Sequence, residues 1–371
     1  MVRIILHHTR ANVNLFLHQP QEFIVRPLSA IMPPPLITPS TRSLNMSHSV
    51  APAPSTRGLI IALLATALLL GACDKAESGR DSHLRRGTAV PDTFAFANLD
   101  EIRDYFVAAK YTIDDWRGGD RSVPRFYLAS VPSRWRHEVA PNLPVQLKKR
   151  YFFFVYAPLV LEANETILLN RDRLLDLTLN KTRTAEDQTW LRDLAAQYFL
   201  EAPDNEAVSD DVLDKLAHRL DIVPPSLALA QAAVESGWST SRFSDMGNAL
   251  FGQWTWSGDG ITPAEQRDHL GDYKIRAFDS PEQSIAAYMH NLNTHRSYRD
   301  FRDQRAGLRA AGQALTGKDL ATTLTSYSEK GQEYVEMLLS VIRVNELEQV
   351  DATYLRDMKP VMLVPVGPGS D

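Results

Sequence analysis

The chain has 371 residues, of which 44% are hydrophobic and 23% charged, and its formal net charge is −5. This composition supplies a core for one large or two modest domains and excludes a collagen-like or repeat architecture. The single cysteine excludes an internal disulfide framework and a multi-cysteine metal site.

The pattern of residues 1–73 predicts a leader that precedes the folded part. Residues 1–45 are rich in proline and lack a sustained period, so we expect a dispensable or non-native extension, with the true start at Met46. Residues 46–73 combine Arg57, an apolar run over 59–70 and small residues before Cys73, which is the layout of a secretory signal. The apolar run is too short to span a bilayer comfortably.

The segment Leu70-Gly-Ala-Cys73 resembles the box at which bacterial lipoproteins are lipidated. The resemblance implies a lipidated Cys73 as mature N-terminus and a membrane-anchored, periplasmic protein of the cell envelope. Asp74 is similar to the inner-membrane retention signal of some Gram-negative lipoproteins. A core helix with an incidental thiol is the alternative interpretation.

Removal of residues 1–72 takes away five arginines and one glutamate, which leaves 35 basic and 44 acidic residues. Such an acidic protein is a poor candidate for nucleic-acid binding, because phosphates would repel it. Residues 74–95 are mostly polar and predict a tether that keeps the folded part within about 60 Å of the membrane.

Residues 96–205 predict a helical accessory region without chemistry of its own. Apolar spacing favours a helix from Leu99, two or three helices over 145–175 that break near Pro158, and a helix over 187–199. Residues 125–131 could form a strand. The aromatic run over 151–156 indicates core packing more than a sugar-binding surface.

After a helix over 210–220, a second helix is predicted between Pro225 and Gly237, which are typical first and last residues of a helix. Leu227, Ala230 and Val234 give it an apolar stripe, so we expect an amphipathic helix with one face in a core.

Glu235 occupies the last turn of this helix, where unpaired carbonyls and the helix macrodipole oppose a carboxylate. Four aromatic residues are available to exclude water: Trp238, Phe243, Phe251 and Trp254. Both effects would raise the pKa of Glu235, and a carboxyl group protonated near neutral pH is what a general acid requires.

The remaining chain predicts a small lobe and further helices. Residues 253–256, a turn at 257–260 and the alternating residues 273–278 favour a small antiparallel sheet. Ser280 and Gln283 form a capping-box pattern that starts a helix, and further helices are expected around Leu320 and over 334–345. From Asp351 onward we expect a loose tail, because its prolines oppose a helix.

Two segments carry a family resemblance: Ala230-Gln-Ala-Ala-Val-Glu-Ser-Gly-Trp238 and Gly247-Asn-Ala-Leu-Phe-Gly-Gln-Trp254. They resemble the catalytic core of bacterial peptidoglycan glucosaminidases of glycoside hydrolase family 73, and residues 288–298 resemble its Bax-like branch. The resemblance is strong over 208–345 and fainter over 96–200. It implies an α+β, predominantly helical, lysozyme-like glucosaminidase domain over 206–348 with a small β insertion, followed by a tail over 349–371.

The resemblance also implies an enzyme without a cofactor that cleaves the β-1,4 bond after N-acetylglucosamine in peptidoglycan. Glu235 would be the general acid, with Glu265 preferred as second carboxylate, then Asp272, ahead of Asp259 and Asp268. A substrate-assisted route would need no second carboxylate. Tyr327 would orient the acetamido group or a water, and the sugar subsite would be lined by Asn248, Phe251, Gly252, Gln253 and Trp254.

Other interpretations stay open at this point. Phe251 could belong to the core, and Trp254 and Trp256 could pack rather than stack on sugars. His290 and His295 are five residues apart, a spacing that does not place two metal ligands on one helix face, so no metal is expected. A lytic transglycosylase would use the same glutamate, and a wall-binding protein would not cut at all.

Overall fold

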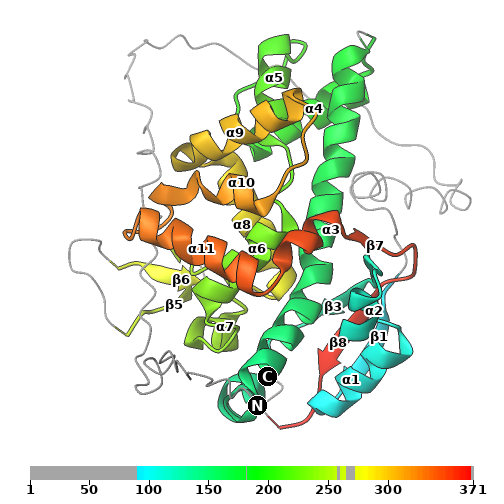
Figure 1. The fold of residues 1–371 in the computed structure, drawn as a ribbon. Coiled ribbons are helices and arrows are strands. Elements are labelled where there is room, and N and C mark those ends of the chain that lie inside the picture. Colours follow the sequence, from blue (N-terminus) through cyan, green and yellow to red (C-terminus); the bar gives the residue numbers. More distant parts are fainter. Residues whose placement is uncertain (1–89, 181, 257–259, 265–271, 369–371) are drawn as a thin grey trace, which may run out of the picture.

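The computed structural model describes residues 90–180, 182–256, 260–264 and 272–368. Helices dominate this part of the chain and small sheets accompany them (Figure 1). The predicted class, a predominantly helical α+β fold, is confirmed. The predicted leader and most of the predicted tether lie outside the described residues.

The longer helices are α1 (Leu99–Ala108), α3 (Val145–Leu179), α4 (Ala185–Gln197), α5 (Asp210–Arg219), α6 (Pro225–Ser236), α8 (Pro281–Thr294), α9 (Arg299–Ala310) and α11 (Gln332–Val344). Shorter helical pieces are α2 (Ile113–Arg117), α7 (Arg242–Gly247), α10 (Gly317–Ala321), the π-helical turn η1 (Trp135–Val139), and the 3₁₀ turns η2 (Ala140–Asn142), η4 (Arg296–Tyr298), η5 (Leu324–Ser326) and η6 (Leu347–Ala352).

The strands form three sheets within the described residues. The first is parallel, in the order β1 (Asp92–Phe96), β8 (Val361–Pro365) and β3 (Phe126–Leu128). The second pairs β2 (Ser122–Val123) with β7 (Tyr354–Leu355). The third is antiparallel, in the order β4 (Trp254–Thr255), β6 (Lys274–Arg276) and β5 (Gly260–Ile261), and it is the small lobe that the sequence predicts.

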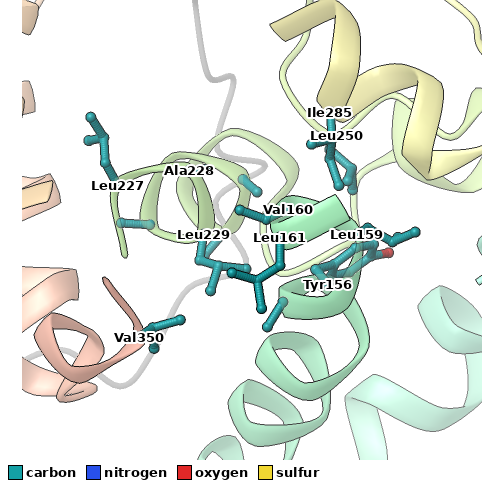
Figure 2. Packing of buried hydrophobic residues seen from close by; sticks show 14 of the residues in the cluster. Tyr156, Leu159, Val160, Leu161, Leu227, Ala228, Leu229, Leu250, Ile285 and Val350 are labelled. Carbon is teal, nitrogen blue, oxygen red and sulfur yellow. The ribbon is translucent and has the colours of Figure 1, made fainter. Parts of the chain in front are cut away.

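Helix α6 lies at the centre of the core. All of its side chains except Val234 are buried, so the predicted amphipathic helix with one buried face is wrong. Its alanines are small, which lets α3, α10 and α11 pack closely around it. Figure 2 shows Leu227 to Leu229 of α6 together with Val160 and Leu161 of α3, and all belong to one cluster.

The C-terminal part of the chain holds the start of α6. Pro224 supplies no side-chain cap there. Instead, Asp351 accepts hydrogen bonds from the N–H and the hydroxyl of Ser226, at 2.8 and 2.7 Å, and from the N–H of Gly317 at 2.9 Å. These bonds satisfy a backbone donor that the first helical turn leaves free.

The predicted loose tail after Asp351 is therefore wrong. The prolines do oppose a helix, but Val361 and Leu363 alternate with less buried residues along β8, which is the central strand of the parallel sheet. Residues 92–95, counted with the predicted tether, form most of β1 and pair with this strand.

The predicted break near Pro158 is also wrong, because α3 is one helix of 35 residues that contains this proline. Proline cannot donate to the carbonyl four residues earlier, which belongs to Phe154. The hydroxyl of Tyr111 donates to that carbonyl instead, at 3.2 Å. By length and hydropathy α3 could cross a membrane, but Leu159 and Val160 in its middle are fully buried in the protein core.

Most other predicted elements are confirmed. The helices α1, α4, α5, α8 and α11 lie within a few residues of their expected bounds, and residues 126–128 form a strand. Ser280 caps α8 by accepting a hydrogen bond from the N–H of Gln283. Residues before and after position 205 contribute to one hydrophobic cluster, so the helical accessory region packs directly against the predicted glucosaminidase domain.

Candidate active site

Glu235 lies in the last turn of α6, just before the chain leaves the helix. Gly237 ends the helix in the left-handed conformation, with a φ of 58°, which glycine adopts without strain. The predicted limits of this helix, Pro225 and Gly237, are confirmed. Glu235 is only 9% exposed, so its carboxyl group has lost most of its hydration.

Burial raises the pKa of Glu235 to about 7, and a hydrogen bond from Tyr334 opposes part of that rise. The hydroxyl of Tyr334 donates to Oε1 at 2.6 Å. The predicted direction of the pKa shift is confirmed. A carboxyl group with this pKa is about half protonated at neutral pH, which suits a general acid.

Tyrosines form the electrostatic surroundings of this carboxyl group. Tyr288, Tyr327 and Tyr334 are at most 2% exposed, and burial, followed by the charge of Glu235 and of neighbouring tyrosines, raises the pKa of each well above its ordinary value. They therefore stay protonated at physiological pH and can act only as neutral hydroxyl groups.

The structure shows what the four aromatic residues that were predicted to exclude water pack against. Trp238 packs edge-on against Phe152 and Phe153 of α3. Phe243 and Trp254 belong to the separate cluster of the small lobe. Phe251 is 1% exposed and stacks on Tyr288, with ring centroids 3.8 Å apart, so the alternative interpretation of Phe251 as a core residue is the one that its burial favours.

A chain of hydrogen bonds leads to Glu235 through buried side chains. The hydroxyl of Tyr288 donates to Oε1 of Gln231 at 2.6 Å, and Nε2 of Gln231 lies 3.0 Å from the hydroxyl oxygen of Tyr334. Sequence reasoning missed all three residues. The available signal was the spacing of four residues between Gln231 and Glu235, which places both on the same helix face. Tyr288 and Tyr334 have the sequence pattern of apolar-stripe residues.

Tyr327 stacks on Tyr334, with ring centroids 5.4 Å apart and an interplanar angle of 5°. The structure thus places Tyr327 next to Tyr334, the residue that donates a hydrogen bond to Glu235. No described residue forms a hydrogen bond with its hydroxyl group. Its role toward an acetamido group stays a prediction.

The three residues that follow α6 have an uncommon backbone conformation. Gly237, Trp238 and Ser239 have positive φ values of 58°, 63° and 61°. For the two non-glycine residues this conformation costs energy and needs support from the surroundings. Nε1 of Trp135 donates to the Trp238 carbonyl at 3.0 Å, and the hydroxyls of Tyr156 and Ser239 are 2.6 Å apart. The accessory region therefore braces the turn next to Glu235.

Asn248 has no free amide atoms for a sugar. Its Oδ1 accepts from the N–H of Val131 at 2.8 Å, and its Nδ2 donates to the carbonyls of Phe278 and Asp279 at 3.0 and 3.2 Å. The side chain joins three backbone segments. The structure therefore gives Asn248 a bracing role, and its predicted contact with a sugar stays a prediction.

The next residues of the same segment approach the small lobe. Gly252 has a φ of 58°, and Trp254 stacks on Tyr273 with ring centroids 4.5 Å apart. Oε1 of Gln253 is buried and has no hydrogen-bond partner among the described residues. Trp256 is 44% exposed. Gln253 therefore has a buried acceptor that no described residue satisfies, and Trp256 lies partly at the surface.

The second carboxylate is not identified by these contacts. Glu265, like Asp259 and Asp268, lies outside the described residues. Asp272 is exposed and lies just before β6. The influences on the pKa of Glu235 are burial and Tyr334, and no described carboxylate is among them.

The two histidines considered as metal ligands have ordinary partners. Nε2 of His290 donates to the carbonyl of Gln197 at 2.8 Å, and Nδ1 of His295 accepts from the N–H of Ser297 at 3.3 Å. Within residues 90–368, leaving out the gaps named above, no group of three His, Cys, Asp or Glu side chains could hold a metal ion.

Comparisons with known proteins agree with the location of this site. A family model described as mannosyl-glycoprotein endo-beta-N-acetylglucosaminidase matches residues 211–347, which include Glu235, Tyr327 and Tyr334. The chain is also similar to Protein bax of Escherichia coli (strain K12), with 30% identity over 202 residues that cover 54% of this chain and 70% of that protein. No solved structure matches the chain.

Proposed function

Because the chain belongs to the Bax-like glucosaminidase-domain proteins, we propose that it hydrolyses the β-1,4 bond after N-acetylglucosamine in peptidoglycan. The family domain identifies a glycosidase, and the particular bond and the general acid are our proposal. One observation carries it: Glu235 is a nearly buried carboxyl group with a pKa of about 7 at the end of a helix in the core.

In the proposed reaction, protonated Glu235 gives its proton to the departing glycosidic oxygen. The bond between that oxygen and the sugar C1 breaks, and the oxygen of a water molecule bonds to C1 and loses a proton. In an inverting reaction a second carboxylate accepts that proton, and Glu265 and then Asp272 are the proposed candidates. In a substrate-assisted reaction the acetamido oxygen attacks C1 first, and Tyr327 would orient this group.

The glycan would lie between the small lobe and the helices. The unpartnered Oε1 of Gln253 supports this placement, because a buried acceptor without a partner costs free energy that a sugar hydroxyl or N–H would recover. The exposed ring of Trp256 supports it as well, since sugar rings stack on aromatic faces.

One observation also favours a second candidate, a lytic transglycosylase. Such an enzyme uses one glutamate as acid and then as base, and it cuts after N-acetylmuramic acid by intramolecular attack. Within the described residues, Glu235 is the one carboxyl group that interacts with Tyr288, Tyr327 and Tyr334. A site with a single carboxyl group is what a transglycosylase requires.

Mass spectrometry of peptidoglycan digested by the purified protein tests the proposal. Fragments with N-acetylglucosamine at the reducing end are the expected result. Anhydro-muramyl ends would instead support the transglycosylase. Retained binding without any cleavage would contradict both and support a wall-binding protein.

We further propose that Cys73 is lipidated and holds the protein at the periplasmic face of a membrane, with the inner membrane favoured by Asp74. Both residues lie outside the described part of the chain, and the support is the lipoprotein-box resemblance. The intact mass of the protein from its own host tests this. A lipidated Cys73 at the N-terminus is expected, and an unprocessed Met1 would contradict it.

A further inference from the structure

We propose that Gln231 is a positioning residue that turns the Tyr334 hydroxyl toward Oε1 of Glu235, so that Oε2 is the oxygen that carries and delivers the catalytic proton. The inference rests on Glu235 as the acid of the proposed function and goes beyond it, because it assigns roles to Gln231, Tyr334 and Tyr288. None of the three touches the scissile bond in this account. They act through Glu235.

The direction of the hydrogen bonds follows from counting protons. A tyrosine hydroxyl has one proton, and Tyr288 places its proton on Oε1 of Gln231. The amide nitrogen of Gln231 therefore faces Tyr334 and donates to its hydroxyl oxygen at 3.0 Å. The proton of Tyr334 is then left for Glu235, whose Oε1 lies 2.6 Å away.

The reverse arrangement of the amide would break this chain. If Oε1 of Gln231 faced Tyr334, that oxygen would take the Tyr334 proton, and Glu235 would lose its donor. The ionised carboxylate of Glu235 opposes the reversal, because it can only accept and takes the Tyr334 proton, which leaves the Tyr334 oxygen to accept from the amide nitrogen of Gln231. The ring of Tyr288 is held in a parallel stack on Phe251, with centroids 3.8 Å apart and an interplanar angle of 4°. Phe251 thus contributes to the site from within the core.

Oε1 and Oε2 of Glu235 consequently have different roles. Oε1 accepts from Tyr334 both before and after the proton leaves, whereas no described residue forms a hydrogen bond with Oε2. Tyr334 from α11 is the described titratable group that acts on the pKa of Glu235, and no described residue of α3 or α10 does so. Burial, and to a smaller extent the charge of Glu235, raises the pKa of Tyr288 from α8 and of Tyr327 after η5. The relay therefore controls how readily the acid ionises.

The test is a titration of Glu235 by NMR in the full chain with ¹³C-labelled glutamate carboxyl groups, assigned with Glu235→Gln. In Gln231→Met the Tyr334 hydroxyl is free to turn and accept from the protonated acid, so the pKa of Glu235 should rise by about one unit. Tyr334→Phe should raise it by about one to two units. Tyr288→Phe, which frees the amide to reverse, should give a smaller rise than Gln231→Met.

Tyr111→Phe is the matched control, because it removes another buried tyrosine hydroxyl, the donor to the Phe154 carbonyl, far along the chain from Glu235. It should lower stability and leave the pKa of Glu235 unchanged. The inference is overturned if Tyr334→Phe shifts this pKa while Gln231→Met does not. If Gln231→Met does not fold, Tyr288→Phe decides the question by the same titration.

Kinetics on peptidoglycan give a second measurement. Gln231→Met should lower kcat by about ten- to a hundredfold with little change in KM, and the alkaline limb of kcat should move up in pH with the titration. If the alkaline limb of kcat in a folded Gln231→Met variant stayed at the wild-type pH, the inference would be contradicted. Because the NMR titration needs no substrate, it stays decisive if the protein proves not to cleave peptidoglycan, and a failure of the proposed function is then seen separately.

Discussion

The hydroxyl of Tyr334 lies 2.6 Å from a carboxyl oxygen of Glu235, although 99 residues separate the two along the chain. This contact joins α11 to the central helix α6 inside one hydrophobic cluster. It keeps the pKa of the buried carboxyl group near 7, because burial alone would raise it further. At neutral pH the carboxyl group is therefore about half protonated and can donate a proton.

The raised pKa of Glu235 predicts a particular dependence of stability on pH. Unfolding returns this pKa from about 7 to its ordinary value of 4.5, so the folded state holds the proton more tightly. The stabilising contribution is complete below pH 4.5 and is lost as the pH rises through 7, by about 3 kcal/mol in the free energy of unfolding. Urea unfolding of the wild type and Glu235→Gln at several pH values measures it. Parallel curves for the two proteins would contradict the prediction.

Asp351 should stabilise the helix that carries Glu235. Asp351→Ala removes the acceptor for two groups of Ser226 and for the N–H of Gly317, so the free energy of unfolding should fall by about 2 kcal/mol. Denaturant unfolding at pH 7 measures the loss. Asp357→Ala, an exposed carboxylate nearby in sequence, is the control and should cost little. Equal effects of the two variants would argue against the capping role.

Tyr156 should support activity from outside the family domain. Tyr156→Phe removes the hydroxyl that bonds to Ser239 in the turn of positive φ values after α6, which loosens the position of Glu235. We expect kcat to fall by about tenfold and stability to fall by about 1 kcal/mol. Tyr111→Phe should cost similar stability without the loss in kcat. A variant of Tyr156 with unaltered kcat would show that the brace has no part in activity.

The glucosaminidase domain should not fold without the accessory region. Residues 206–371 alone would expose the α6 side chains that α3 covers and would leave β8 without β1 and β3. We expect an aggregated or molten product with no cooperative thermal transition. Calorimetry and circular dichroism test this. A cooperative transition together with unchanged activity would contradict it.

Local signals were enough for much of the fold. Pro225 and Gly237 set the ends of α6, and Ser280 with Gln283 set the start of α8, because capping depends on residues close in sequence. The helix α3 was not predictable in the same way. Its passage through Pro158 depends on a hydroxyl from Tyr111, 43 residues before its acceptor, Phe154.

The site and the C-terminal segment also combine features with local sequence signals and features that depend on distant residues. Glu235 is predicted from its helix position and from the two segments that resemble the family, whereas its partner Tyr334 lies on another helix and has only the pattern of an apolar-stripe residue. The sequence predicts a tail where β8 forms, because the partners of this strand, β1 and β3, come from the other end of the chain. Pairings of this range leave no local pattern in either segment.

The most direct measurement of the central claim is the rate of peptidoglycan cleavage by Glu235→Gln beside the wild type, with Glu333→Gln, an exposed residue of α11, as the matched control. Because the amide cannot donate the catalytic proton, the account predicts a loss of about a hundred- to ten-thousandfold for Glu235→Gln, with the control unchanged. A folded Glu235→Gln protein that releases N-acetylglucosamine reducing ends at the wild-type rate would contradict the assignment of Glu235 as the acid.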